Sequence, residues 1–206
     1  MHTQFKSRRQ IATSVEKKYN RNAERISHLT KLLDAAGAKP ASILDVGCGN
    51  AEITDEIAKI LNIRRVYGVD VYPESEFVRT GNVAYSQVCD EKIRVANNVV
   101  ELVCCFMSIH HFDHFDKMMN EILRVMCSGG YLFIREHDVP PKNMTLKNML
   151  DEKHKQYPDH PGGIINYWGR AELQAELESR GLQYMGSSDY QTYNPQAIYY
   201  SLYKKR

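Results

Sequence analysis

The feature that most constrains the fold of this chain is a hydrophobic run followed at once by a glycine-rich turn and a helical pattern, within residues 42–61. Residues 42–46 predict a short buried parallel strand because they are mostly aliphatic. Gly47 and Gly49 predict a tight turn, and the apolar residues at 53, 57, 60 and 61 share one face of a helix. A strand, a glycine turn and a helix form the first half of a nucleotide-binding βαβ unit.

Two acids strengthen this interpretation. Asp45 lies inside the first strand, where a carboxylate is costly unless it has a polar partner. A second hydrophobic strand, at 65–70, ends in Asp70, which lies 25 residues after Asp45 and is placed to accept hydrogen bonds from both hydroxyls of a ribose. The third glycine of the dinucleotide fingerprint is replaced by Ala51. An ordinary strand-to-helix loop is therefore the alternative to a nucleoside site.

Length and composition predict a single domain that spans residues 1–206. Hydrophobic residues make up 43% of the chain and charged residues 25%, as in soluble globular proteins. No apolar run approaches the roughly 18 residues of a membrane span, and the N-terminus lacks the apolar core of a signal peptide. The five cysteines form no CxxC pair and favour buried, reduced thiols, so we expect a cytoplasmic location.

Three stretches carry a resemblance to a known family. They are Ile-Leu-Asp-Val-Gly-Cys-Gly-Asn at 43–50, Val-Tyr-Gly-Val-Asp at 66–70, and 100–136, which includes Ser-Ile-His-His-Phe at 108–112 and Gly-Gly-Tyr-Leu-Phe-Ile at 129–134. Over residues 40–136 the chain resembles the class I S-adenosylmethionine-dependent methyltransferases, in particular the branch of the ubiquinone and menaquinone methyltransferases. The resemblance implies an α/β, Rossmann-like fold. Its seven-stranded, mostly parallel sheet has the order 3-2-1-4-5-7-6, with the last strand antiparallel and helices on both faces.

The resemblance also implies a set of residues around S-adenosylmethionine. The methionine portion is expected at the first glycine turn, the ribose at the end of the second strand, the adenine at the end of the third, and the amino group at the end of the fourth. In that order the expected residues are Asp45, Gly47, Cys48 and Gly49, then Asp70 and Val71, then Cys89 and Asp90, and finally Phe106. For Asp90, an aspartate that caps a loop is the alternative.

Periodicity predicts the remaining elements. Strands are expected at 84–89, 99–106 and 131–135, with an antiparallel pair at 182–187 and 197–203. Helices are expected at 22–36, 115–126, 146–157 and 170–180, with Gly129 and Gly130 ending the second of these. Residues 1–20 show no firm periodicity. Residues 139–168 are the least family-like part and predict an insertion that caps the acceptor site, as such insertions do in these folds.

Positive charge gathers at the N-terminus, in an arm and helix at 1–37. Residues 1–31 hold eight lysines and arginines against two glutamates, a net charge of +6, while the whole chain carries +2. The remainder therefore carries −4, although it ends in Lys204, Lys205 and Arg206. A basic arm on a mildly acidic body favours contact with phosphate, and a solvated terminal helix is the alternative.

Methyl transfer requires mainly that donor and acceptor be aligned, and a general base helps when the acceptor must lose a proton. The candidates for this role are His110, His111, Glu136 and His137. The alternative for the adjacent histidines is that one caps a loop while the other packs on a helix. A two-histidine, one-carboxylate metal site has no recognised spacing here, so we predict no metal. Its residues would come from His110, His111, Asp113, His114 and Asp116.

The sequence favours a small-molecule acceptor. Phe106-Met-Ser-Ile stands where enzymes that methylate amino groups of nucleic acids carry Asn/Asp-Pro-Pro-Tyr/Phe, and the Lys-Asp-Lys-Glu set of ribose methyltransferases is not evident. Tyr157, Tyr167 and Trp168 are predicted either to stack on an aromatic acceptor or to pack in the core. The basic arm favours RNA, including capped RNA, as the alternative acceptor. A third possibility is an inactive scaffold that binds the cofactor.

Overall fold

One mostly parallel sheet organises the molecule. The computed structural model describes residues 8–77, 81–156, 165–189 and 194–206, with side chains from residue 21 onward. Its seven strands have the order β3-β2-β1-β4-β5-β7-β6, and β7 runs antiparallel to both β5 and β6. This confirms the predicted topology. The strands are β1 Ser42–Val46, β2 Arg65–Asp70, β3 Ala84–Gln87, β4 Val100–Phe106, β5 Met126–His137, β6 Leu182–Asp189 and β7 Ile198–Lys205.

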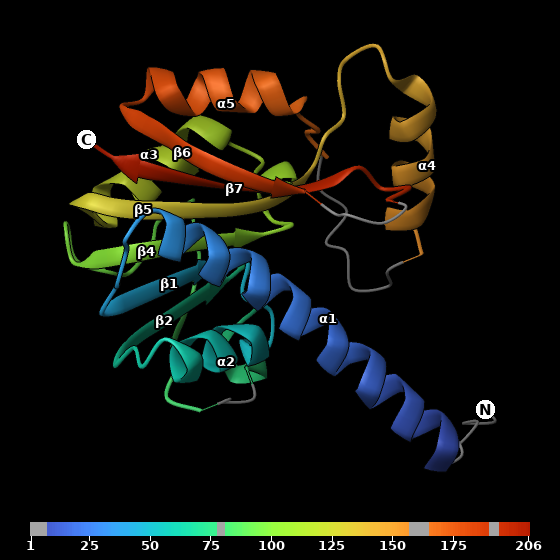
Figure 1. The fold of residues 1–206 in the computed structure, drawn as a ribbon, viewed down its shortest axis with the longest axis horizontal. Helices are drawn as coiled ribbons and strands as arrows, with labels where there is room; N and C mark the ends of the chain where they lie inside the picture. The colour runs from blue at the N-terminus through green and yellow to red at the C-terminus, as the bar shows by residue number, and fades with distance from the viewer. Residues whose placement is uncertain (1–7, 78–80, 157–164, 190–193) are drawn as a thin grey trace.

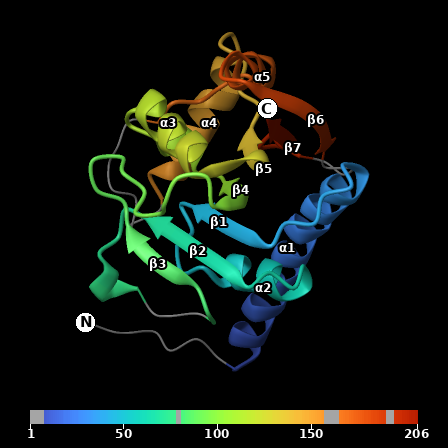
Figure 2. The same cartoon turned by 90° about the vertical axis from the view of Figure 1, so that its left-hand side faces the viewer.

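Helices cover both faces of the sheet (Figures 1 and 2). The helices α1 and α2 share a buried apolar cluster with one face, and α3 and α5 share a second cluster with the other face. The fourth helix, α4, stands apart from both layers (Figure 1). The helices are α1 Arg8–Ala35, α2 Glu52–Ile60, α3 Phe115–Val125, α4 Met144–His154 and α5 Arg170–Ser179, with 3-10 turns η1 Glu74–Glu76 and η2 Ile109–His111.

The strands at the centre of the sheet are buried on both faces. In β1, Ile43 belongs to the cluster under α1 and α2, while Leu44 belongs to the cluster under α3 and α5. Leu102 and Val103 of β4 alternate between the two clusters in the same way. This is why β1 and β4 are mostly hydrophobic in sequence, as expected of strands covered by helices on both faces.

The first helix is longer than predicted. It begins at Arg8, whereas periodicity placed its start at residue 22 and assigned no element to residues 1–20. Its first half extends past the sheet (Figure 1). A stretch of helix that extends past the sheet needs no apolar stripe facing the sheet, which explains why no period was detected there. Residues 1–7, and the side chains of 8–20, lie outside what the structure describes.

Two glycines were assigned the wrong role. Gly129 and Gly130 lie inside β5, which spans 126–137 instead of 131–135, and α3 ends before them at Val125. The pairing of β5 with β4 slips between Val100 and Leu102, so the strand needs an irregular step there. A Cβ on Gly130 would lie 2.9 Å from the Cys127 carbonyl oxygen, which explains the glycine. The glycines thus permit a bulge and do not end a helix.

Other element ends differ less. The third strand ends at Gln87, and Cys89 forms only an isolated bridge with Lys92. Helix α4 spans 144–154 instead of 146–157, and the predicted Tyr157 lies outside the described residues. Of the free cysteines, 48, 104 and 105 are buried, 127 is partly buried and 89 is exposed. None of the described helices combines the length and the apolar character needed to cross a bilayer.

Candidate active site at the carboxyl edge of the sheet

The four neighbouring parallel strands β2, β1, β4 and β5 end at one edge of the sheet, and most of the predicted site residues lie at or just beyond their ends. Ligands of open α/β sheets bind outside this edge. The chain leaves β5 at the same edge and continues into α4, which stands beyond the end of the sheet (Figure 1). The edge therefore has two parts, one at β1 to β3 and one between β4, β5 and α4.

Asp45 is a buried acid whose polar surroundings are incomplete. It is 1% exposed, and its Oδ2 accepts a 2.5 Å hydrogen bond from the hydroxyl of Thr54 on α2. Its Oδ1 has no hydrogen-bond partner within the described part of the chain. Burial raises the pKa of Asp45 to about 7, against the lowering effect of Thr54. Such a carboxylate would gain from a cationic ligand beside it.

The turn after β1 is held in place by the end of β2. Asp70 accepts hydrogen bonds from the backbone N–H groups of Gly49 and Val71, each at 2.7 Å. Each carboxylate oxygen keeps a further lone pair for a ligand hydroxyl. Gly49 has a φ of +54°, and a Cβ built on it meets nothing within 4 Å, so its backbone faces open space. The turn thus exposes main chain next to an acid.

Gly47 has a different reason to be glycine. Its φ is +78°, and a Cβ there would lie 2.6 Å from the Cβ of Ser108, which follows β4. The missing side chain therefore allows the loops after β1 and β4 to touch. The Ser108 hydroxyl is buried and, like Asp45 Oδ1, has no hydrogen-bond partner among the described residues. Two unsatisfied polar atoms thus lie near the same glycine turn.

Cys48 points away from this edge. Its sulfur lies 2.9 Å from the position a Cβ on Gly68 of β2 would take, so the side chain fills the core beside that strand. Burial raises the pKa of its thiol above the usual range. Its backbone N–H donates to Val69 and its carbonyl accepts from Ala51. Unlike its glycine neighbours, Cys48 is therefore not carried into the proposed site.

The remaining cofactor candidates lie along the ends of β2, β3 and β4. Val71 is 54% exposed directly after Asp70, an unusual position for an aliphatic side chain. Asp90 is exposed in the loop after β3 with a φ of +52°, next to the exposed Cys89. Phe106, at the end of β4, is partly buried against Phe133. Of these four, Phe106 alone packs against the core cluster that contains Cys48.

These residues fit the expected S-adenosylmethionine. The unsatisfied oxygens of Asp45 and Ser108 suit an ammonium group, and the open backbone at Gly49 admits a ligand next to the Asp70 carboxylate. The exposed Val71 suits the face of a base. The fit rests on buried polar atoms that the described chain itself leaves without partners.

The second part of the edge is built around a buried histidine–glutamate pair. His110 on η2 is 2% exposed, and its Nδ1 lies 2.6 Å from Oε2 of Glu136, near the end of β5. The other glutamate oxygen accepts a 2.9 Å hydrogen bond from the backbone N–H of Ile109. Burial alone would raise the pKa of Glu136, but the adjacent His110 holds it below its usual value. An ionised Glu136 fixes the His110 ring with Nδ1 toward it, so Nε2 is directed away.

The His137 ring is oriented by a backbone carbonyl, whereas the His110 ring is oriented by a carboxylate. The His137 Nδ1 lies 2.6 Å from the carbonyl oxygen of Gln196, and a carbonyl only accepts, so Nδ1 carries the proton. Burial lowers the pKa of His137 to about 4. His137 is therefore neutral near pH 7, and its ring lies 5.6 Å from that of His110.

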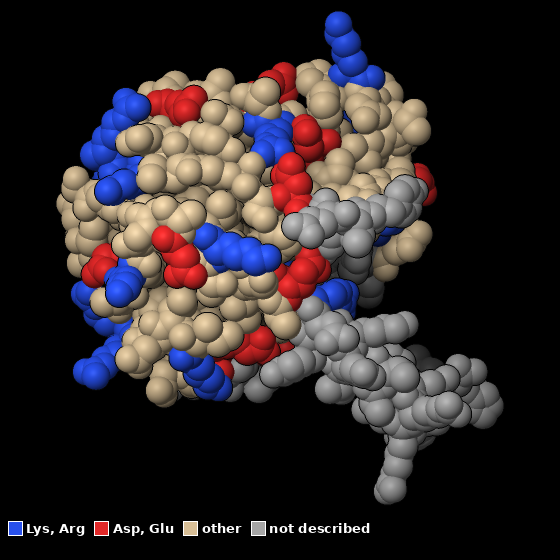
Figure 3. Space-filling view, viewed as in Figure 1, with Lys and Arg blue, Asp and Glu red and all other residues tan. Residues whose placement is uncertain are grey.

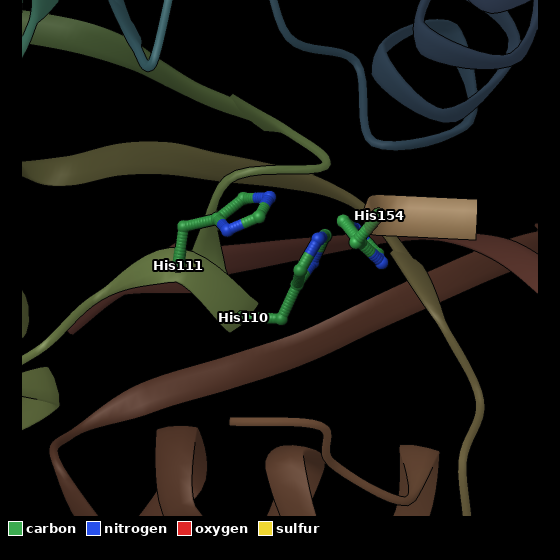
Figure 4. A group of neighbouring side chains, drawn as sticks. All are labelled: His110, His111 and His154. Atoms are coloured by element: carbon green, nitrogen blue, oxygen red, sulfur yellow. The ribbon is translucent and has the colours of Figure 1, made fainter. Parts of the chain in front are cut away.

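Helix α4 contributes a residue that sequence analysis did not identify. His154, the last residue of α4, has its ring centroid 5.3 Å from those of both His110 and His111 (Figure 4). Tyr167 closes the group, with its hydroxyl 2.9 Å from His154 Nδ1. The insertion has no pattern that marks His154, because it approaches the edge only through the tertiary fold. Thr54 and Ser108 were missed for the same reason.

Trp168 and Tyr167 contact different parts of the structure. Trp168 lies against Phe115 of α3, at a centroid distance of 4.8 Å, and so packs toward the core. Tyr167 borders the histidines on one side. On the other it lines an open hollow of about 730 Å³ together with Asn166, Trp168 and residues of α3 and α5. By contrast, Asp113 and His114, named with the histidines for a metal, lie on the exposed surface.

Comparison with known proteins identifies the family. Residues 17–185 match the family model described as a methyltransferase domain. The chain is 28% identical over 122 residues to ajmaline N-methyltransferase of Rauvolfia serpentina, covering 53% of this chain and 41% of that protein. It is 27% identical over 116 residues to demethylmenaquinone methyltransferase of Chlorobaculum parvum, covering 55% and 47%. The chain thus spans somewhat less than half the length of these two relatives.

A solved structure gives the same fold. A SAM-dependent methyltransferase of Methanosarcina mazei superimposes with a TM-score of 0.59 at 17% identity, covering 81% of this chain and 93% of that one. The family match spans most of the sequence, and the strand order is the one that the resemblance implied. The chain therefore belongs to the methyltransferase-domain family, the class I S-adenosylmethionine-dependent methyltransferases.

Proposed function

We propose that this chain transfers a methyl group from S-adenosylmethionine to an oxygen, nitrogen or carbon atom of a small molecule that lies between the turn after β4 and α4. The observation that carries the acceptor position is the buried His110–Glu136 pair, which lies at the same sheet edge as Asp45 and Asp70 and faces α4. When bound, the cofactor supplies a methyl group on a sulfonium, which a nucleophile displaces in line.

In the cofactor half, Asp45 and the turn at Gly47 and Gly49 bind the methionine portion. Oδ1 of Asp45 accepts from the ammonium group, which gives that buried oxygen the partner it lacks within the described chain. Asp70 accepts from the ribose hydroxyls while it keeps its hydrogen bonds to the turn. Toward β3, Val71, Cys89 and Asp90 would surround the adenine. At the end of β4, the main chain of Phe106 would meet the amino group of the methionine portion.

In the acceptor half, His110 faces the reacting atom through Nε2 and accepts its hydrogen bond. Glu136 is a positioning residue, because it fixes the ring through Nδ1. The His111 ring borders the same space, and the neutral His137 ring lies next to that of His110. Alignment of two bound reactants alone can lower a barrier by about 7–11 kcal/mol, so a rigid pair of rings next to the donor is sufficient machinery.

Two observations support a small acceptor. The two curated relatives are named for ajmaline and demethylmenaquinone. On the face drawn in Figure 3, lysines and arginines alternate with acids over the described surface, so that face offers no continuous phosphate-binding track.

RNA is the second candidate, and one feature favours it. Helix α1 begins at Arg8, so the basic residues from Arg8 onward lie along a helix whose first half extends past the sheet (Figure 1). Phosphate contacts by such a helix would make transfer fall steeply as salt is raised.

The test is transfer of a labelled methyl group to a metabolite extract and, separately, to an RNA pool. We expect label in the metabolite pool with the wild-type chain. His110→Ala should lower transfer by about 100-fold, in the range for loss of a group at the reacting atom, while calorimetry shows unchanged cofactor affinity. His114→Ala, at an exposed position, is the matched control. Label in RNA alone would select the second candidate, and cofactor binding without label in either pool would indicate an inactive scaffold.

A further inference from the structure

The acceptor half contains a cluster with the composition of a metal site. One imidazole nitrogen from each of His110, His111 and His154 lies within 4.8 Å of those of the other two. We propose that these three histidines bind a divalent metal ion of the kind that prefers imidazole, with zinc as the first candidate, and that the ion holds the acceptor. This departs from the prediction of no metal, whose candidate ligands did not include His154.

The ring positions suit a common ion. Centroid distances are 4.1 Å between His110 and His111 and 5.3 Å from each of these to His154. Zinc–nitrogen bonds of about 2.1 Å place the ligand atoms of a tetrahedral site about 3.4 Å apart, so the rings need to move by about 1 Å or less. His111 and His154 are partly exposed and lie on a short turn and at a helix end, where such a shift is small. Figure 4 shows the three rings gathered between these two elements.

The hydrogen bonds that orient two of the rings are the stronger observation. Metal-binding histidines usually donate their other N–H to a carboxylate or a carbonyl. His110 has Nδ1 at 2.6 Å from Glu136, and His154 has Nδ1 at 2.8 Å from the carbonyl oxygen of Leu150, one turn earlier in α4. Both rings would then bind the ion through Nε2. Two of the three candidate ligands thus already carry the outer partner that orients a ligand.

Charge and coordination indicate the class of acceptor. Imidazole ligands leave the charge of a divalent ion in place, and one of the three rings lies 2.6 Å from the buried Glu136 carboxyl. Three protein ligands leave a fourth position open, as in catalytic zinc sites. A hydroxyl of the acceptor, such as a phenol or an enol, fits this position because coordination makes it acidic near neutral pH. The coordinated oxygen anion then offsets part of the charge of the ion.

Methyl transfer at such a site accounts for every proton, bond and electron pair. The acceptor hydroxyl loses its proton to water on coordination, and its oxygen forms a bond to the methyl carbon. The sulfur–carbon bond breaks, and its electron pair stays on sulfur. His110 then acts as a ligand, and the ion takes over the role of lowering the hydroxyl pKa. This inference rests on the proposed function for the position of the acceptor, but not for the binding of the ion.

The test is metal binding itself, with untagged chain freed of metal by a chelator. We expect calorimetry with Zn²⁺ to give one site per chain, and Co²⁺ to give the visible absorption of a tetrahedral nitrogen site. His154→Ala and His111→Ala should weaken binding by about 100-fold or more. Glu136→Gln should weaken it about 10- to 100-fold and shift the Co²⁺ spectrum, the effect expected of an outer partner. His114→Ala should bind as the wild type does.

Two outcomes would overturn the site. One is a wild-type chain that binds neither ion at micromolar concentrations. The other is a His154→Ala chain that binds as tightly as the wild type, which would assign the metal to other residues. Calorimetry with S-adenosylhomocysteine on the same samples separates this from the proposed function. Cofactor binding without metal binding rejects the metal site alone, whereas absent cofactor binding rejects the proposed function.

Discussion

At the scale of single residues, the buried charge of Asp45 lowers the stability of the folded chain, and we expect bound cofactor to offset this cost. The pKa of Asp45 in the folded chain, about 7, lies above the ordinary aspartate value of 3.8, because burial disfavours the charged form. Above pH 3.8 the unfolded chain loses this proton while the folded chain keeps it up to about pH 7. The contribution of the neutral carboxyl to stability is therefore complete below pH 3.8 and is lost as pH rises through 7. A shift of about 3 units corresponds to about 4 kcal/mol, an upper value.

Asp45→Asn removes the charge and keeps the shape, so we expect the unliganded variant to be more stable than the wild type at pH 8. The difference should approach 4 kcal/mol at most, about the cost of the buried charge, and shrink toward zero near pH 4. The variant should also bind the cofactor more weakly. Urea denaturation across this pH range checks the first point, with the exposed Asp34→Asn as the control. A difference that grows as pH falls would contradict the assignment.

Substitutions at the two glycines of the turn should lower the stability of the chain by different amounts. Gly47→Ala places a methyl group 2.6 Å from the Cβ of Ser108, at a φ of +78°. We expect a loss of about 3 kcal/mol in the free energy of unfolding, from overlap and backbone strain together. Gly49→Ala meets nothing within 4 Å at a φ of +54°, so about 1 kcal/mol is expected from strain alone.

The variants should separate in cofactor binding as well. The methyl group of Gly49→Ala lies in the open space beside Asp70, so cofactor affinity should fall more than stability does. Urea denaturation and calorimetry on both variants measure the two effects. Equal losses of stability would show that the loop after β4 does not press on Gly47.

At the scale of elements, the insertion helix α4 is the least secured part that reaches the site. It buries Leu150, which is 1% exposed, while Met144 on the same helix is 55% exposed. Leu150→Ala removes that anchor, and the cost of such a change is about 2–5 kcal/mol. Because α4 stands apart from the helix layers, we expect the loss to appear as local opening.

Amide hydrogen exchange across 144–154 should accelerate by about 30-fold or more in Leu150→Ala, the equivalent of 2 kcal/mol. Exchange in β1 and β4 should stay unchanged. The apparent affinity for the acceptor should fall while cofactor affinity is kept, and Met144→Ala should behave as the wild type. Faster exchange throughout the sheet would show instead that α4 is part of the cooperative core.

Elements could be predicted where burial imposes a period. The central strands β1 and β4 and the stripe of α3 were visible because each contacts the core along its length. The start of α1 at Arg8 was not, because its first half extends past the sheet. Gly129 and Gly130 were misread because a glycine pair that ends a helix and one that permits a bulge look alike in sequence.

At the scale of the whole molecule, the sheet edge is divided between two ligands. The cofactor half was predictable because Asp45, the glycine turn and Asp70 are close in sequence and bound by the geometry of one βαβ unit. The acceptor half brings together η2, the end of β5 and the end of α4, so His154 and Tyr167 join His110 only through the tertiary fold. That half depends on the insertion, which the family resemblance over residues 40–136 does not include.

The central claim is that the end of β2 holds the sugar of the cofactor next to the glycine turn. Calorimetry with S-adenosylmethionine on wild type, Asp70→Asn and Glu76→Gln tests it most directly, with thermal melts to show that each chain is folded. Loss of charge-assisted hydrogen bonds costs about 1.5–3 kcal/mol, so Asp70→Asn should bind about 10- to 100-fold more weakly than the wild type, while Glu76→Gln binds equally well. A folded wild-type chain that gives no binding heat, or an Asp70→Asn chain that binds as tightly as the wild type, would contradict the account.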